Sequence, residues 1–431
     1  MKIAIAGTGY VGLVTGVCLA EVGHENVVCV DVDNKKVDLM KSGVSPIYEE
    51  HLEELMKKNY ELGRIDYTTN YKEAYEDADI IMIAVGTPER SDGSANLEYI
   101  KEVATQVANC VTKDTLVVIK STVPIGTNDN IEKYIQENLK NNVRVELASN
   151  PEFLSQGTAV MDTLKASRIV IGVESEWAKN LLEEVYAPFN QPIVVTNRNS
   201  AEMIKYASND FLALKISFMN DIANLCEIVG ANIEDVANGM SYDDRIGSKF
   251  LKSGIGYGGS CFPKDTKALH WLSSQNGYEL KTVKAAIEVN ESQKLRLIKK
   301  AENLVDSFEG KKISILGLTF KPGTDDLREA PSIPNIQYFI EKGADVIAYD
   351  PVGIENTKKI FEDNIKYTTS IDEAIEGSDI CFIMTEWKQI MEYDITNYKT
   401  KMNRPLVFDG RNCYSLDTMK NLGVEYYSIG R

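Results

Sequence analysis

The residues with the clearest capacity for chemistry lie in the stretch GIGYGGSCFPKD, residues 254–265. Its glycines predict a loop whose backbone can approach a ligand closely, and Pro263 marks the start of a helix that continues through DTKALHWLSS. Cys261 therefore stands at a predicted helix N-terminus beside Lys264, and both features favour the thiolate over the thiol. A thiolate is nucleophilic at neutral pH. We expect Cys261 to be a covalent nucleophile; the alternative is a small buried cysteine without a reaction.

The other cysteines and the histidines do not suggest a second kind of chemistry. The cysteines follow strand or helix patterns, or fall in the 410–414 loop, and are expected to be buried: Cys18, Cys29, Cys110, Cys226, Cys381 and Cys413. Seven is an odd number and no CxxC pair occurs, which argues against a disulfide framework. His24, His51 and His270 have neither ligand nor triad spacing, so we expect no metal site.

A second motif, GTGYVG at residues 7–12, follows the apolar strand 2–6 and precedes a helical stretch. Gly7 permits a tight turn, Gly9 lets a pyrophosphate approach the backbone, and Gly12 lets helix and strand pack closely. Asp31 ends the next strand, where a carboxylate accepts a hydrogen bond from a ribose 2′-hydroxyl and repels a 2′-phosphate. The pattern favours NAD over NADP; the alternative is a glycine turn without a ligand.

The elements that must position these residues form two similar halves. Strands at 2–6, 27–33, 79–88 and 115–124 alternate with helical stretches. The stretches 311–320, 345–351, 373–387 and 405–412 repeat the order, and 373–387 mirrors 73–88. This alternation predicts an α/β protein with two doubly wound, Rossmann-like parallel-sheet domains. The second half lacks the glycine fingerprint. Its Lys321 and Arg328 either hold the phosphates of a different nucleotide or are solvated loop charges.

A long helix is predicted between the halves, because Ser200–Val229 contains neither Pro nor Gly. Apolar residues recur there at spacings of three and four: Ile204, Ala207, Phe211, Leu214, Phe218, Ile222, Leu225 and Val229. Such a helix is roughly 45 Å long. We expect it to join the domains and to pair with its copy in a homodimer; the alternative is a monomer. The expected domains are 1–198, which binds NAD, 199–300, which is helical and carries the loop with Cys261, and 301–431, the second Rossmann-like domain.

Composition excludes several classes of protein. The 47 Lys and Arg residues against 64 Asp and Glu give a net charge of −17, which argues against nucleic-acid binding. No stretch reaches the roughly 18 consecutive apolar residues of a membrane span, so we expect no membrane partner. Met1 and Lys2 lead straight into a strand, without the pattern of a secretory signal. A cytoplasmic location is therefore expected.

The order of the motifs resembles the UDP-glucose 6-dehydrogenase family, within the wider UDP-glucose/GDP-mannose dehydrogenase group. The resemblance runs essentially the whole chain: GTGYVG, VGTP (85–88), STVPIGT (121–127), NPEFL (150–154), AEMIKYASN (201–209), FLKSGIGYGGSCFPKD (250–265), FKPGTDDLREAPS (320–332) and FDGRN (408–412). It implies an NAD-dependent, four-electron oxidation of UDP-glucose to UDP-glucuronate through a thiohemiacetal and a thioester on Cys261. GDP-mannose or a UDP-N-acetylhexosamine is an alternative substrate.

The resemblance also implies roles for individual residues. Cys261 matches the nucleophile, Lys205, Asn209 and Asp265 match polar groups around the reacting carbon, and Thr122 and Glu152 match residues that hold a water or take a proton. The implied cofactor contacts are Gly7, Gly9, Tyr10, Val11, Gly12, Asp31, Lys36, Thr87, Thr122, Gln156, Lys264 and Arg328. The implied substrate contacts are Glu152, Phe153, Leu154, Lys205, Asn209, Phe250, Leu251, Lys252, Ser253, Gly254, Tyr257, Gly258, Lys321, Arg411 and, on the neighbouring subunit's substrate, Arg245.

The sequence departs from the family pattern at position 156, where the usual Glu is Gln156. An amide hydrogen-bonds but cannot act as a general base, so Glu152 becomes the better proton acceptor. Two other hypotheses remain at this point. One is a simple two-electron dehydrogenase, which needs no cysteine nucleophile, and the other is a nucleotide-sugar binding protein without turnover.

Overall fold

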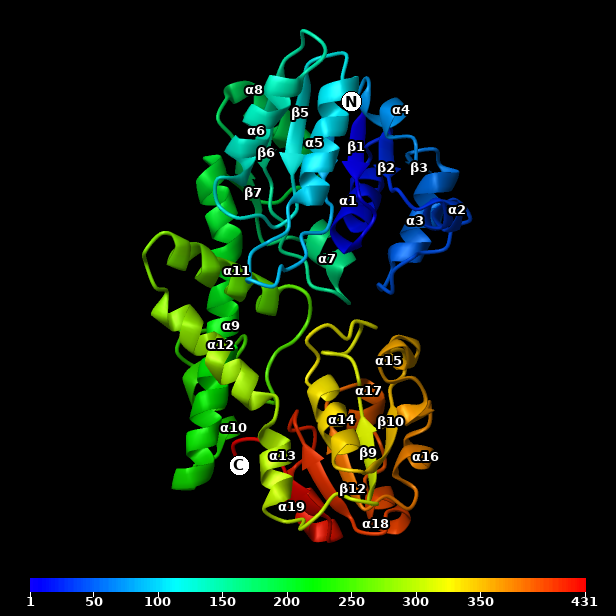
Figure 1. Ribbon diagram of the computed structural model, residues 1–431, viewed down its shortest axis with the longest axis vertical. Coiled ribbons are helices and arrows are strands. Elements are labelled where there is room, and N and C mark those ends of the chain that lie inside the picture. The colour runs from blue at the N-terminus through cyan, green and yellow to red at the C-terminus, as the bar shows by residue number, and fades with distance from the viewer. The chain divides into compact units, whose positions relative to one another are not determined.

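The computed structural model describes the whole chain, Met1–Arg431. The chain forms two compact units, Met1–Ser208 and Asn209–Arg431, and each is built around one β-sheet (Figure 1). The boundary falls inside α9, Arg198–Val229. The two doubly wound domains and the long central helix predicted from the sequence are confirmed.

The N-terminal unit contains an eight-stranded sheet in the order β3-β2-β1-β4-β5-β6-β7-β8. The strands are β1 (Ile3–Ala6), β2 (Val27–Val30), β3 (Ile65–Thr68), β4 (Ile80–Ile83), β5 (Thr115–Ile119), β6 (Val145–Ser149), β7 (Ile169–Gly172) and β8 (Ile193–Thr196). Neighbouring strands are parallel except β6 and β7, which meet antiparallel. The first six strands have the doubly wound order, which places a crevice at the carboxyl ends of β1 and β4, where the order reverses.

Helices cover both faces of this sheet. They are α1 (Tyr10–Glu21), α2 (Asn34–Lys41), α3 (Leu52–Glu61), α4 (Tyr71–Tyr75), α5 (Glu98–Cys110), α6 (Thr127–Asn138), α7 (Ala159–Leu164) and α8 (Glu176–Tyr186). Ile3 and Ile5 point into a core shared with α1 and α8, whereas Ala4 and Ala6 point into one shared with α5 and α6. Central strands buried on both faces require continuous apolar runs, which is the pattern of the glycine-motif strand.

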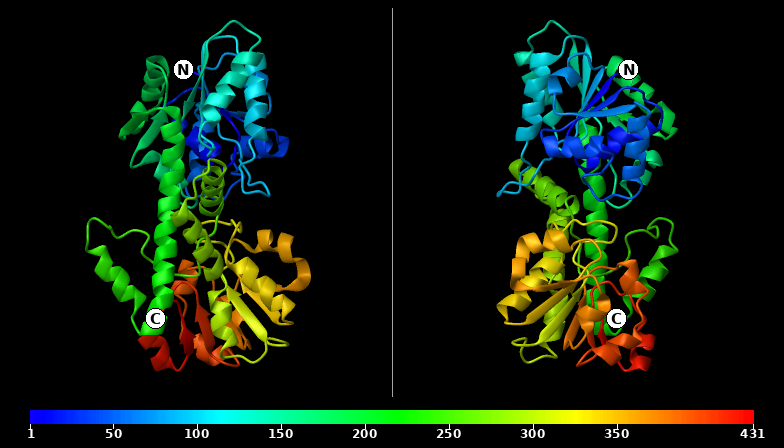
Figure 2. Two further views of the ribbon diagram at one scale, coloured as in Figure 1. Left: turned by 60° about the vertical axis from the view of Figure 1, so that its left-hand side comes forward. Right: turned by 90° about the vertical axis from the view of Figure 1, so that its right-hand side faces the viewer.

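The C-terminal unit repeats the doubly wound order as β11-β10-β9-β12-β13-β14, with every pair parallel. These strands are β9 (Lys312–Leu316), β10 (Asp345–Tyr349), β11 (Lys366–Thr368), β12 (Ile380–Ile383), β13 (Leu406–Asp409) and β14 (Glu425–Tyr427). Figure 2 shows helices on both faces of this sheet. The helices after α9 are α10 (Ile233–Ser241), α11 (Phe262–Gln275), α12 (Lys281–Gln293), α13 (Arg296–Glu302), α14 (Ser332–Glu341), α15 (Ile354–Phe361), α16 (Ile371–Ile375), α17 (Lys388–Met391), α18 (Thr396–Lys401) and α19 (Leu416–Leu422).

The helix α9 has 32 residues and begins at a cluster of charges. The Arg198 side chain, only 9% exposed, lies 2.7 Å from a carboxylate oxygen of Asp129, 2.8 Å from Glu132 and 3.8 Å from Glu174. Gly230 follows the helix with φ +78°, the left-handed conformation that commonly ends helices. The first turn of α9 is thus fixed by ion pairs to the N-terminal unit.

None of the helices is both long and apolar enough to cross a lipid bilayer.

Arg198→Leu should lower the free energy of unfolding of the N-terminal unit by about 3 kcal/mol, because it leaves carboxylates without their buried cation. Thermal denaturation at pH 7 measures the loss. Asp129→Asn is the matched control: the Asp129 side chain is 48% exposed, so its ion pair should contribute less than about 1 kcal/mol. Equal losses in the two variants would contradict the proposed anchoring by Arg198.

Candidate functional site

The turn after β1 has the shape of a dinucleotide cradle. Gly7 has φ +96°, and a Cβ on Gly12 would lie 2.0 Å from the Gly7 carbonyl oxygen, so neither position admits a side chain. Gly9, at the N-cap of α1, differs: a Cβ there would meet nothing within 4 Å. No neighbouring atom of the protein therefore excludes a side chain at Gly9, in contrast to Gly7 and Gly12. The open space lies against the free N–H groups of a helix N-terminus, which suit a pyrophosphate.

Asp31 lies directly after β2 and beside this turn. Its Oδ2 accepts a hydrogen bond from the Thr8 hydroxyl and, at 3.2 Å, one from the Thr8 N–H. Lys36 Nζ is 3.8 Å away. Burial alone would raise the pKa of Asp31, but the bonds from Thr8 and the Asp33 N–H and the charge of Lys36 hold it below the ordinary value. Asp31 is therefore a fixed carboxylate beside the glycine turn.

Other predicted cofactor residues line the same carboxyl edge of the sheet. Thr87 follows β4 and donates its hydroxyl to the carbonyl of Thr122, which follows β5, at 3.0 Å. Tyr10, in the first turn of α1, donates to the carbonyl of Tyr48 at 2.7 Å. Gln156 lies in the loop after β6 and is 8% exposed. The N-terminal unit thus gathers these residues at the edge where doubly wound sheets bind ligands.

Glu152 and Lys205 form a buried ion pair in the N-terminal unit. Lys205 Nζ, on α9, donates to Glu152 Oε1 at 2.9 Å, and the two side chains are 3% and 8% exposed. The other oxygen of Glu152 accepts the Leu154 N–H at 2.8 Å. The Phe153 ring lies 5.5 Å from Lys205 Nζ. A carboxylate and an ammonium are therefore held together in the interior of the N-terminal unit.

Cys261 is the N-cap residue of α11 in the C-terminal unit. It is partly exposed, and the Ser260 hydroxyl lies 3.7 Å from its sulfur. By contrast, burial raises the pKa of Cys18, Cys29 and Cys381 to about 12, which leaves these thiols protonated at neutral pH. The predicted nucleophile is thus an accessible cysteine at the positive end of a helix.

A pair of polar side chains lies near the start of the same helix. Asn209 on α9 donates its amide to Asp265 Oδ2 at 2.6 Å, and both residues are buried. Lys264 Nζ is 3.6 Å from the other oxygen of Asp265. Asp210 is also buried, with neither oxygen hydrogen-bonded. Burial and the neighbouring Asp265 raise the pKa of Asp210 to about 8, so its neutral acid form predominates at pH 7.

The glycine loop before Cys261 is fixed on several sides within the C-terminal unit. The Asn290 side chain accepts the Tyr257 N–H at 2.8 Å and donates to the Tyr257 carbonyl at 3.0 Å. A Cβ on Gly258 would lie 2.4 Å from the Glu329 carbonyl oxygen, and one on Gly254 would lie 2.8 Å from a carbonyl of the loop after β13. The glycines are thus required by close packing of backbone on backbone.

The remaining predicted substrate residues occupy different settings. Phe250 has φ +64°, a strained conformation for a non-glycine residue. Arg411 donates to the carbonyls of Gly256 at 3.2 Å and Phe320 at 3.2 Å, so it joins the glycine loop to the loop after β9. Of the others, Leu251 and Gly254 are buried, Ser253 and Lys321 are half-buried, Lys252 is exposed, and Arg245 pairs with Asp243 on the surface. Arg328, predicted as a cofactor contact, is exposed.

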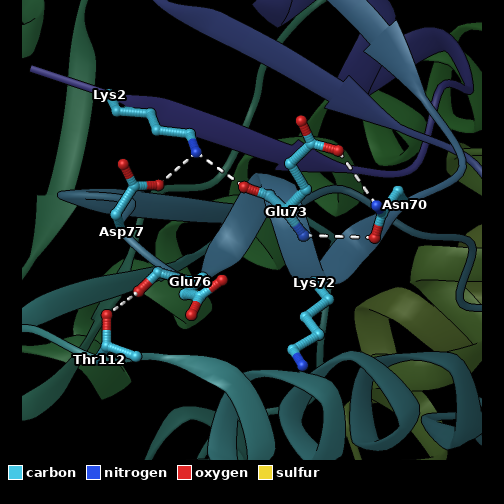
Figure 3. Close-up of a pocket in the computed structure, with 7 residues that line it drawn as sticks. All are labelled: Lys2, Asn70, Lys72, Glu73, Glu76, Asp77 and Thr112. Atoms are coloured by element: carbon cyan, nitrogen blue, oxygen red, sulfur yellow. Dashed lines mark hydrogen bonds and ion pairs between the residues drawn. The ribbon is translucent and has the colours of Figure 1, made fainter.

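A hollow at the opposite end of the N-terminal sheet is a poor candidate for the site. It is lined by Lys2, Asn70, Lys72, Glu73, Glu76, Asp77 and Thr112. Lys2 donates to Asp77 and, at 2.8 Å, to the carbonyl of Glu73, while Thr112 donates to the Glu76 carbonyl at 2.7 Å (Figure 3). It lies where β1 begins, away from the glycine turn, and its polar groups largely bind one another.

Three models of one protein family match the chain in succession. They are the NAD-binding domain at residues 1–190, the central domain at 199–292 and the UDP-binding domain at 314–416 of the UDP-glucose/GDP-mannose dehydrogenase family. The UDP-glucose 6-dehydrogenase YwqF of Bacillus subtilis is 52% identical over all of this chain and 98% of its own length. The chain belongs to this family.

Solved structures of family members agree with the fold. A UDP-glucose dehydrogenase from the archaeon Pyrobaculum islandicum matches with a TM-score of 0.92 and 35% identity, over 99% of this chain and 96% of that one. A UDP-D-ManNAc dehydrogenase from Pyrococcus horikoshii matches with a TM-score of 0.88 and 27% identity, over 100% and 99%. NAD is thus the cofactor of the N-terminal unit, as Asp31 predicted.

The C-terminal unit, which matches the family's UDP-binding domain, differs from the N-terminal unit at Asp350. This residue follows β10 as Asp31 follows β2, but it is fully buried. Its oxygens accept the Leu318 N–H at 2.7 Å, the Gly353 N–H at 2.7 Å and the Trp387 indole N–H at 3.0 Å. No part of this carboxylate remains for a ribose hydroxyl.

The sequence did not indicate a group of buried polar side chains near Glu152, namely those of Lys120, Asn150 and Tyr186. Lys120 Nζ donates to Asn150 Oδ1 at 2.8 Å, and Tyr186 donates to the same oxygen. A sequence signal for a buried Lys120 was its place directly after the wholly apolar run LVVI. A strand on the surface would alternate apolar with polar residues before the lysine.

Asp31→Ser should weaken NAD binding in this family member. A hydrogen bond to a charged acceptor contributes about 1.5–3 kcal/mol, which corresponds to roughly a ten- to hundredfold loss of affinity. NADP should lose less or gain, since the repelling carboxylate is gone. Calorimetric titration with both cofactors measures the change, with Asp33→Ser, which can still cap α2, as control. Unchanged NAD affinity in Asp31→Ser would overturn the assignment.

Proposed function

We propose that this protein oxidises the primary alcohol at C6 of UDP-glucose to a carboxylate, with water supplying the second oxygen. The observation that carries the proposal is Cys261, a partly exposed thiol at the N-cap of α11 beside the buried Asn209–Asp265 pair. A dehydrogenase that stopped at the aldehyde would have no use for such a thiol.

NAD, when bound, accepts one hydride in each of the two oxidations. Gly9 and Asp31 would hold its pyrophosphate and ribose, since one leaves space at the α1 N-terminus and the other offers a fixed carboxylate. Lys36, Thr87, Lys264 and Arg328 are proposed as further contacts, with Tyr10, Val11, Thr122 and Gln156.

Cys261 supplies the covalent step. After the alcohol has lost a proton and a hydride, the thiolate sulfur adds to the aldehyde carbon and gives a thiohemiacetal. Loss of the second hydride from that carbon leaves a thioester, and water then displaces the sulfur as a thiolate and releases the acid. The aldehyde needs this addition because its carbonyl carbon cannot give up hydride until a group has added to it.

The buried polar groups control charge and protons around these steps. We assign to the Lys205 ammonium and the Asn209 amide the stabilisation of the thiohemiacetal oxyanion. Glu152, which already holds Lys205 at 2.9 Å, takes the alcohol proton, with Thr122 positioning the water. Asp265 accepts a proton from the water that attacks the thioester.

The substrate assignment rests on the C-terminal unit and on the relatives. Arg411 and Lys321 are cationic side chains next to the glycine loop and the loop after β9, and they are proposed to hold the UDP part with residues 250–258. The relative named UDP-glucose 6-dehydrogenase is 52% identical, whereas the UDP-D-ManNAc dehydrogenase is 27% identical. UDP-glucose is therefore favoured over N-acetylated sugars.

The purified protein with excess NAD should form two NADH for each UDP-glucose consumed. Cys261→Ser should keep the fold but lose UDP-glucuronate formation by at least about a thousandfold, as expected for removal of a covalent nucleophile. Cys413→Ser, at the other partly exposed cysteine, is the control and should retain activity. One NADH per UDP-glucose, or undiminished formation of UDP-glucuronate by Cys261→Ser, would contradict the thioester mechanism.

We also propose that the protein is a homodimer formed through α9. Phe211, Phe218 and Leu225 are seven residues apart on this helix and 62%, 52% and 51% exposed. A seven-residue repeat of large apolar side chains is the pattern by which helices pair. A second copy would cover this stripe, and the exposed Arg245 is then available to the neighbouring subunit's substrate.

Replacing both Phe218 and Leu225 by Glu should convert the dimer to monomer, because charges would face one another across the helix pair. Analytical ultracentrifugation at micromolar concentration measures the mass. Ile360→Glu, at a 49% exposed apolar position on α15, is the control and should leave the mass unchanged. A wild-type monomer, or a dimer that persists in the double variant, would contradict the proposed interface.

A cytoplasmic location is part of the same proposal. All seven cysteines are free, and a nucleophilic thiol such as Cys261 persists where cellular reductants keep thiols reduced.

A further inference from the structure

The buried lysine at the end of β5 belongs to no role described so far. Lys120 is 6% exposed. Its ammonium nitrogen lies 2.8 Å from Asn150 Oδ1, 3.4 Å from the Asn150 carbonyl oxygen and 3.3 Å from the Tyr186 hydroxyl. Three N–H donors thus face three oxygens, all of them within the N-terminal unit.

The partner of this lysine, Asn150, begins the loop that carries Glu152. Asn150 is 1% exposed and is held by four contacts: its N–H donates to the Ile119 carbonyl at 3.0 Å, its amide donates to the Val170 carbonyl at 2.8 Å, and Tyr186 on α8 donates to its Oδ1. Lys120 supplies the fourth contact. Any movement of Asn150 moves the loop in which Glu152 pairs with Lys205.

We propose that Lys120 is a positioning residue for the oxidation, acting through Asn150 to fix Glu152 and adding a buried positive charge behind the Glu152–Lys205 pair. It does not touch substrate or cofactor. This inference rests on the proposed function, in which Glu152 takes the alcohol proton.

The protonation state of Lys120 is the means by which the role can be observed. Burial lowers the pKa of Lys120 to about 8, with Lys205 acting in the same direction and Glu152 opposing it. The titratable groups around Lys120 in this unit are Glu152 after β6, Lys205 on α9 and Tyr186 on α8, and burial raises the pKa of Tyr186 far above neutrality. Tyr186 thus stays protonated while Lys120 titrates.

Loss of the Lys120 proton has a definite direction of effect. Below about pH 8 the ammonium donates to all three oxygens. Above about pH 8 the neutral amine of Lys120 has only two N–H donors, and its lone pair faces one of the three oxygens. The positive charge behind Glu152 is also lost. The rate at saturating substrate should therefore fall as the pH rises through about 8.

The first experiment compares kcat from pH 6.5 to 9.5 for the dimeric wild-type enzyme and Lys120→Met, which keeps side-chain length but removes charge and donors. We expect Lys120→Met to lose roughly ten- to hundredfold in kcat, as misplacement of a catalytic group does, and to lack the midpoint near 8. KM for both substrates should change less than about threefold, because Lys120 touches neither of them and their binding in the ground state is unchanged. Lys113→Met, at a lysine that pairs with Asp79 on the surface, should match the wild type.

A second variant tests the charge without removing the lysine. Tyr186→Phe takes away one oxygen that accepts from the ammonium, so the alkaline midpoint should move to lower pH by about half a unit or more. Asp210 also has a pKa raised to about 8 and would titrate in the same range. Asp210→Asn is therefore a control, and its kcat profile must keep the alkaline midpoint.

The outcomes separate this inference from the proposed function. A Lys120→Met enzyme that keeps wild-type kcat and midpoint, or a Tyr186→Phe enzyme with an unshifted midpoint, overturns the positioning role. A midpoint that disappears in Asp210→Asn overturns it as well. In each case two NADH per UDP-glucose would still stand, whereas failure of the proposed function would appear as a changed stoichiometry in the wild type.

Discussion

The N-terminal unit is organised around the burial of one ion pair, Glu152 with Lys205. Removing two charges from water costs several kcal/mol per ion unless geometry and further hydrogen bonds compensate. The compensation comes from the 2.9 Å contact itself, the Leu154 N–H and the Phe153 ring. It also requires α9 to enter the unit at a fixed position, which the ion pairs of Arg198 provide seven residues earlier. The burial of the two charges therefore depends on the contacts that hold both side chains together.

The two units share the doubly wound fold but differ at one pair of equivalent positions. Asp31 and Asp350 both follow the second strand of a doubly wound sheet. Asp31 remains partly accessible beside an open helix N-terminus, whereas Asp350 is fully buried and saturated by backbone N–H groups and the Trp387 indole. A doubly wound sheet offers a crevice in either case, but the free hydrogen-bonding capacity at this position decides which nucleotide can use it.

The sequence predicted those parts of the molecule whose determinants are local. The glycine turn at 7–12, the 32-residue α9 and the helix that starts after Cys261 each follow from residues adjacent in the chain. The strands β3, β6, β7, β8, β11 and β14 were not predicted. Of these, β3, β11 and β14 have three or four residues with polar positions within them, as in IDYT, KYT and EYY. Edge strands this short have no measurable alternation.

The polar network around Lys120 was missed for a related reason. Its contacts join residues 30 and 66 positions apart, and the Glu152–Lys205 pair joins residues 53 apart. Periodicity and motif spacing contain no information on such pairs, which arise only when strands and helices have been placed. The family motifs pointed to Glu152 and Lys205 because chemistry constrains them, but a residue that acts through another has no motif of its own.

The departure at Gln156 has a physical explanation in its surroundings. Glu49 is buried, and its two oxygens accept the N–H groups of Gly157 at 2.7 Å and Ala159 at 2.8 Å, directly after position 156. Gln156 is itself only 8% exposed. A glutamate at this buried position would place a negative charge away from water, which is costly unless the charge is paired. The neutral amide keeps a donor and an acceptor at this edge of the sheet, while Glu49 fixes the backbone of the loop.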